Sequence, residues 1–118
     1  ALVDDVLRRD PFIPSRAWCL HWQAIGFAMQ RDFETAVAKL RESVRLEPLY
    51  SFSRVDLARC LANIGRTAEA QEAIDEVRRL YPALTLDCIV ANVRHLRGDE
   101  MAADYSRAIG GLWESPPS

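Results

Sequence analysis

The stretch FETAVAKLRESVRLEP at residues 33–48 recurs 34 positions later as TAEAQEAIDEVRRLYP at residues 67–82. In both copies a small residue, a large apolar residue and a proline occupy matching places, namely Ala36 and Ala70, Leu40 and Ile74, and Pro48 and Pro82. A proline ends a helix because its ring leaves no backbone N–H for the helix interior. Anchors at a fixed period predict a repeated pair of helices that stack along the chain.

Hydrophobic periodicity extends this pattern to about seven helices and an all-α fold. The expected helices lie at residues 1–9, 15–30, 33–46, 51–64, 67–81, 84–97 and 99–113. We expect residues 1–14 to hold the second helix of an incomplete leading repeat. Two full units follow at 15–48 and 49–82, and a degenerate third unit with capping helices spans 83–113. Residues 114–118 form a tail whose prolines prevent further helix.

The composition predicts one soluble globular domain. The chain has 118 residues, of which 49% are hydrophobic and 27% are charged. The net charge of −2 gives no basic surface for a nucleic-acid backbone. No apolar run approaches the roughly 18 residues of a membrane helix, and no signal peptide is recognisable. We therefore expect a cytoplasmic protein that neither binds nucleic acid nor inserts into a membrane.

The three cysteines, Cys19, Cys60 and Cys88, are odd in number and lack CxxC spacing. This spacing argues against a zinc site or a disulfide framework. We expect small buried apolar side chains in a reducing compartment.

The repeat anchors resemble those of the tetratricopeptide repeat (TPR). With residue 17 as the start of the first unit, its signature positions hold Leu20, Ala24, Phe27, Phe33, Ala36, Leu40, Ser43 and Pro48. The second unit has Leu57, Ala58, Leu61, Gly65, Ala70, Ile74, Val77 and Pro82. The departures from the pattern are Gln23, Arg54 and Thr67. The resemblance implies a right-handed α-solenoid of antiparallel helix pairs.

A narrower resemblance covers RRDPFIPSRAW at 8–18, RDFETAVAKLRESVRLEP at 31–48 and LARCLANIGRTAEAQEAIDEVRRLYPALTL at 57–86. These segments are similar to the C-terminal repeat region of bacterial class III adenylate and guanylate cyclases and of related signalling proteins. Gly111-Leu112 and Pro116 match the close of that region, although its usual basic stretch is absent. The resemblance implies a non-catalytic C-terminal fragment of a larger bacterial signalling protein.

The TPR resemblance also implies a concave groove lined by the first helix of each pair. The groove positions carry Trp18, His21, Trp22, Ile25, Met29, Phe52, Val55, Asp56, Arg59, Asn63, Leu86, Ile89, Val90 and Val93. An apolar, aromatic surface of this kind is typical of a binding site for a peptide, a helix or a second copy of the chain. The alternative is that neighbouring helices already cover these residues.

No residue pattern in the sequence indicates catalysis or a metal. His21 and His95 fall in different repeats, so we expect neutral, partly buried histidines rather than a catalytic pair. No group of residues has the spacing of metal ligands, and no cofactor is expected. Only Arg59 and Asn63 match the groove residues with which some TPR proteins clamp acidic chaperone tails, and Asp56 opposes them.

The sequence therefore predicts a non-catalytic module for protein–protein interaction or oligomerisation, whose partner is a protein, a peptide or a second copy of itself. A small-molecule sensor that uses the aromatic groove is the alternative hypothesis, and a structural spacer also remains open. An enzyme is the least supported hypothesis, because no constellation of residues points to a reaction.

Overall fold

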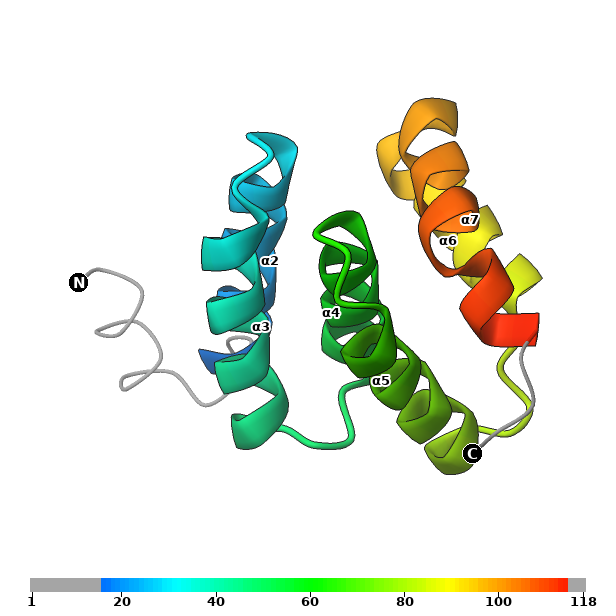
Figure 1. Cartoon of the computed structure of the whole chain (residues 1–118), viewed down its shortest axis with the longest axis horizontal. Coiled ribbons are helices and arrows are strands. Elements are labelled where there is room, and N and C mark those ends of the chain that lie inside the picture. Colours follow the sequence, from blue (N-terminus) through cyan, green and yellow to red (C-terminus); the bar gives the residue numbers. More distant parts are fainter. Residues whose placement is uncertain (1–15, 115–118) are drawn as a thin grey trace.

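The computed structural model describes residues 16–114, and this part of the chain is helical without a β-strand (Figure 1). Its helices are α2 (Arg16–Met29), α3 (Phe33–Leu46), α4 (Ser51–Asn63), α5 (Thr67–Leu80), α6 (Leu86–Arg97) and α7 (Asp99–Glu114). The all-α prediction is confirmed for the described residues. The helix expected within residues 1–14 and residues 115–118 of the tail lie outside them.

A capping side chain marks the start of α3, and a left-handed glycine turn precedes α5. The Asp32 carboxylate accepts a hydrogen bond from the Thr35 backbone N–H at 3.3 Å, as an N-cap does. Gly65 has a φ of 79° in the turn before α5, a left-handed conformation that glycine adopts without strain. Arg66 holds the N-cap position of α5 without a side-chain hydrogen bond, and Thr67 is the first helical residue.

The start of α6 differs from the sequence-based boundary by two residues. Thr85 is extended, and its side chain accepts a hydrogen bond from the Cys88 backbone N–H at 3.2 Å. This N-cap places the first helical residue at Leu86 instead of position 84. At the other end Gly98, with a φ of 95°, closes α6 and leads directly into α7.

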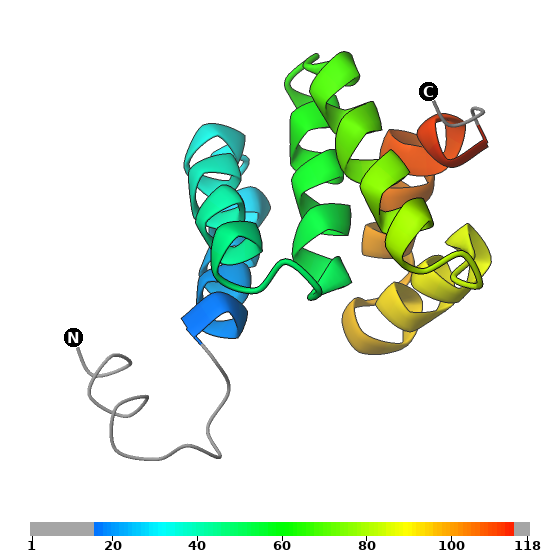
Figure 2. The ribbon, with the colours of Figure 1, turned by 90° about the horizontal axis from the view of Figure 1, so that it is seen from below.

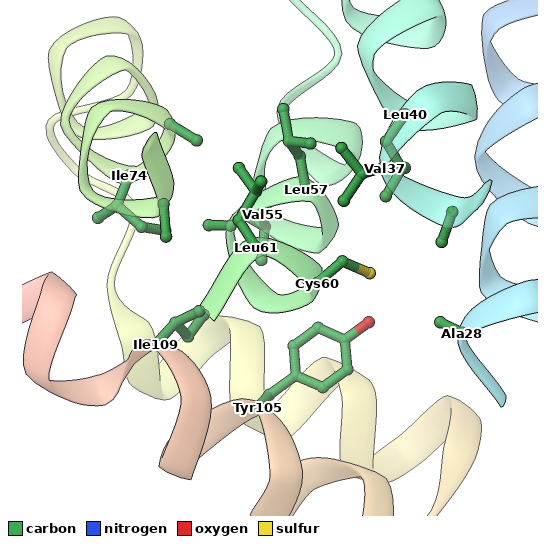
Figure 3. Close-up of a cluster of buried hydrophobic side chains, with 14 of the residues drawn as sticks. Ala28, Val37, Leu40, Val55, Leu57, Cys60, Leu61, Ile74, Tyr105 and Ile109 are labelled. Atoms are coloured by element: carbon green, nitrogen blue, oxygen red, sulfur yellow. The ribbon is translucent and has the colours of Figure 1, made fainter. Parts of the chain in front are cut away.

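The core lies between the helix pairs, with α4 at its centre (Figures 1 and 3). Its largest fully buried apolar side chains include Leu40, Val55, Leu61, Ile74, Tyr105 and Ile109. Burying one such aliphatic side chain stabilises the fold by about 1.5–3 kcal/mol. The Ser43 hydroxyl adds a polar link in this core, because it donates to the Ala17 carbonyl at 2.7 Å and lies 2.6 Å from the Ser53 hydroxyl. Ser43 thereby connects α2, α3 and α4.

The third helix pair does not continue the packing of the first two. α3 packs on α4, so the second pair follows the first. In a regular stack α6 would next pack against α4 and α5. Among the described residues it is α7, and not α6, whose Cα atoms come within 8 Å of α4 and α5 (Figures 1 and 2). α6 therefore has only α7 as a close backbone neighbour.

The cysteines occupy three different environments, and none forms a disulfide. Cys60 is fully buried beside Tyr105, as expected, and burial raises the pKa of its thiol to about 12 (Figure 3). Cys19 is half-buried and Cys88 is exposed. The expectation of buried side chains is therefore wrong for Cys88, which lines a shallow hollow between the starts of α4 and α6.

Candidate functional site

An aromatic pocket of about 200 Å³ opens between α2, α4 and α6. It is lined by Trp18, His21, Trp22, Tyr50, Phe52, Val55, Asp56, Ile89, Asn92, Val93, Leu96, Arg97 and Tyr105. The pocket exists because α6 packs mainly on α7, which leaves its inner face turned toward α2 across α4. Three helices that are far apart in sequence thus contribute to one concavity.

Large aromatic side chains form the rim of this pocket. Trp18 and Trp22 lie one turn apart on α2, with ring centroids 5.7 Å apart in an edge-to-face arrangement. Tyr50 and Phe52 face them from the start of α4, with centroids 6.0 Å apart. Trp18, Trp22 and Phe52 are each about 40% exposed. Mutual packing already restricts the rotation of these rings. Binding of a ligand would therefore cost them little further side-chain entropy.

A buried polar cluster of His21, Asp56, Arg59, Arg97 and Tyr105 lies beneath the rim. Asp56 is its centre: Oδ2 lies 2.5 Å from His21 Nε2, and Oδ1 accepts a hydrogen bond from the Tyr105 hydroxyl. Arg97 Nη1 donates to the Tyr105 hydroxyl at 2.5 Å. The cluster joins α2, α4, α6 and α7, so it holds the walls of the pocket together.

Opposite charges around Asp56 keep it ionised. Burial by itself raises the pKa of a carboxyl group. Burial is the largest single influence on Asp56, but the hydrogen bond and charge of His21 and the guanidiniums of Arg97 and Arg59 together outweigh it. The pKa of Asp56 therefore lies below its usual range. Burial and the Asp56 carboxylate raise the pKa of Tyr105, which stays a hydroxyl and can donate its hydrogen bond.

The two histidines have different environments. His21 is buried and bonds to the carboxylate of Asp56. Asp56 lies 35 residues further along the chain, so the sequence alone did not indicate this pair. Its other ring nitrogen, Nδ1, lies 3.3 Å from the Tyr50 hydroxyl. His95 is exposed on α6. Both ring nitrogens of His21 thus contact protein groups, and its visible role is to connect α2 with α4.

The structure brings most of the predicted groove residues to the aromatic pocket. Those at the pocket are Trp18, His21, Trp22, Phe52, Val55, Asp56, Ile89 and Val93. Ile25 is instead buried, and Met29 is exposed beside a second hollow. Arg59 is buried in the polar cluster, and Asn63 donates its side-chain amide to the Arg59 carbonyl at 2.9 Å. Leu86 and Val90 pack against the core.

Sequence reasoning missed five residues of the pocket, namely Tyr50, Asn92, Leu96, Arg97 and Tyr105. Helical spacing could have indicated two of them, because Asn92 and Leu96 follow Ile89 at intervals of three and seven. Arg97 lies 34 residues after Asn63, at a groove position of the third unit that the predicted groove did not include. Tyr105 reaches the site only through the packing of α7 against α4, and no groove position marks it.

No helix in residues 16–114 is long and apolar enough to cross a membrane. Within the same residues no group of three or more histidine, cysteine and acidic side chains is placed to hold a metal ion. Comparisons with protein-family models, with curated proteins and with solved structures found no match to this chain.

Proposed function

We propose that this chain is a non-catalytic interaction module whose aromatic pocket receives one large apolar side chain of a partner protein or peptide. The observation that carries the proposal is the set of half-exposed rings around a concavity whose base is tied by buried hydrogen bonds. Aromatic anchors in well-packed pockets supply most of the affinity at protein interfaces.

The size of the pocket favours a side chain over a free small molecule. Small-molecule sites in proteins usually measure about 300–1,000 Å³, whereas this pocket measures about 200 Å³. A volume of this order suits one anchor residue, and the rest of the partner would lie on the rim formed by Trp18, Phe52 and Leu96.

The resemblance of residues 17–82 to tetratricopeptide repeats supports the same proposal, because such repeats commonly present a concave surface to a partner. The narrower resemblance to the C-terminal region of bacterial nucleotidyl cyclases suggests which kind of protein the module belongs to. In that case the module serves a larger cytoplasmic signalling protein, and the partner segment belongs either to another protein or to a second copy of the chain.

Trp22→Ala tests the proposal. Trp22 is 39% exposed, so its loss should lower stability only modestly while it opens one wall of the pocket. Peptides selected for binding from a random library should bind this variant at least about tenfold more weakly, as expected for an aromatic hot spot. Circular dichroism should show unchanged helicity.

Leu49→Ala is the matched control, because Leu49 is an apolar side chain with 66% exposure outside the pocket. It should leave peptide binding unchanged. Selected peptides that bind the Trp22 variant as tightly as the original chain would contradict the proposal, since their binding surface would then lie elsewhere.

A further inference from the structure

A basic hollow of about 470 Å³ lies beside the aromatic pocket and shares Arg97 with it. Its charged lining consists of Arg31, Arg59, Arg97, Arg107, Glu100 and Asp104. Four positive charges thus face two negative ones, on a chain whose net charge is −2. This local excess of positive charge is a feature that the proposed function does not use.

The arginines at the base of the hollow have hydrogen-bond donors without acceptors. The Arg59 side chain is only 3% exposed, and its Nη1 donates to Asp104 Oδ2 at 2.9 Å. Its Nε and Nη2 have no hydrogen-bond partner among the described residues, and neither does Nε of Arg97. Buried donors in native proteins nearly always have a partner. The positive charge of these two guanidiniums is therefore only partly compensated by hydrogen bonds within the described residues.

The arginine at the rim sits on an unfavourable backbone. Arg31 has a φ of 62°, the one left-handed non-glycine residue in the described part of the chain. The position 34 residues later, at the equivalent turn, is Gly65 with a φ of 79°. Glycine adopts this conformation without strain, whereas arginine does not. Strained residues of this kind cluster at functional sites. The Arg31 guanidinium lies over the Phe33 ring, 5.2 Å from its centroid, and both residues line the hollow.

The neighbouring carboxylates do not cancel this charge. Asp104 is bonded to both Arg59 and Arg107. Asp56 lies behind the hollow, with Oδ1 3.7 Å from Arg59 Nε and 3.8 Å from Arg97 Nη1, and it takes its hydrogen bonds from the polar cluster. If Asp56 is counted, one positive charge remains in excess, and if it is left out, two remain.

We propose that the basic hollow binds a phosphate group. A phosphate monoester carries a charge of about −1.5 to −2 near pH 7, which matches the excess positive charge. The planar guanidinium offers paired N–H donors that fit phosphate oxygens. Arg31 and Arg107 would hold the group at the rim, and the charges of Arg59 and Arg97 would attract it from below.

Titration calorimetry with inorganic phosphate, at constant ionic strength and pH 7.5, tests this site. The full chain should show saturable binding. Arg31→Gly and Arg107→Gln should each raise the Kd about tenfold, because each removes a charge-assisted hydrogen bond. Arg31→Gly also relieves the left-handed strain, so its thermal midpoint without phosphate should equal or exceed that of the original chain. Loss of binding in this variant would then not reflect loss of the fold.

Arg45→Gln is the control for charge alone. Arg45 is exposed on α3, away from the hollow, and pairs with Glu42. It should leave the Kd unchanged. The absence of saturable binding to the original chain would overturn the proposal, and so would equal weakening by Arg45→Gln.

Two further titrations identify the source of the phosphate group. Tighter binding of O-phosphoserine than of inorganic phosphate would support the site and assign it to a phosphorylated protein segment. Tighter binding of AMP would support the site and assign it to a nucleotide. The Phe52→Ala variant should bind all three probes like the original chain, since Phe52 lines the aromatic pocket and not the basic hollow.

Discussion

At the scale of single residues, Asp56 determines whether the buried polar cluster is stable. It is fully buried, and four other members of the cluster contact its carboxylate. Removing one partner from a buried charged group typically costs about 3–5 kcal/mol, because the remaining charges are left uncompensated. We therefore expect Asp56→Asn to lower the free energy of unfolding in urea by that amount. Asp87→Asn, at an exposed carboxylate in the first turn of α6, should cost less than about 1 kcal/mol.

Asp56 should also make the free energy of unfolding depend on pH. The pKa of Asp56 in the folded chain lies below its usual range, and the unfolded value is about 3.9. Its contribution to stability is therefore complete above about pH 4 and is lost as the pH falls through the folded-state pKa. Urea unfolding from pH 7 down to pH 2.5 should show this loss in the original chain and a flatter profile in Asp56→Asn. Parallel profiles would contradict the central place of Asp56.

Tyr105→Phe separates the hydroxyl of Tyr105 from its ring. The hydroxyl donates to Asp56 and accepts from Arg97, while the ring packs 4.6 Å from the Arg59 guanidinium. Phenylalanine keeps the ring and leaves both polar partners short of one hydrogen bond, so we expect a loss of about 1–3 kcal/mol in the free energy of unfolding. Tyr81→Phe is the control, since Tyr81 is exposed and its hydroxyl donates to the Leu49 carbonyl on the surface. It should change stability by less than about 1 kcal/mol.

At the scale of helices, the existence and order of the elements could be predicted because local signals specify them. The alignment of Leu40 with Ile74 and of Pro48 with Pro82 placed α3 and α5 almost to the residue. The packing of the third pair could not be predicted in this way. It depends on Ala102, Tyr105 and Ile109, all fully buried on α7, and no proline or repeat anchor marks that helix.

This packing predicts uneven local stability. α6 has close backbone contact only with α7 among the described residues, whereas α4 contacts four helices. Helices with few neighbours open at low free-energy cost. Backbone amides of α6 should therefore exchange with deuterium well before those of α4 under native conditions. Ile109→Ala, which removes a fully buried side chain from α7, should cost about 2–5 kcal/mol and should accelerate exchange in α6 as well as in α7. Unchanged exchange in α6 would show that α7 does not anchor it.

At the scale of the whole molecule, part of the candidate site lies at positions that the sequence repeat marks. The rest forms where the third helix pair departs from the packing of the first two. Trp18, Trp22 and Phe52 could be assigned to a groove from their repeat positions alone. Tyr105 could not, because it reaches the pocket only where the third pair departs from the packing of the first two. A periodic sequence pattern describes contacts between equivalent positions, and it contains no information on contacts that break the period.

The molar mass in solution tests whether a second copy of the chain occupies the pocket. Stable protein interfaces bury about 800 Å² on each partner, whereas one aromatic side chain inserted in the pocket would bury about 150–250 Å². Two copies that meet only at this rim would form a weak pair, so light scattering at micromolar concentrations should give a mass close to 13.4 kDa. A mass near twice that value, reduced to 13.4 kDa by Trp22→Ala, would instead identify the second copy as the partner. A doubled mass that Trp22→Ala leaves unchanged would place self-association on another surface and leave the aromatic pocket open to a different protein.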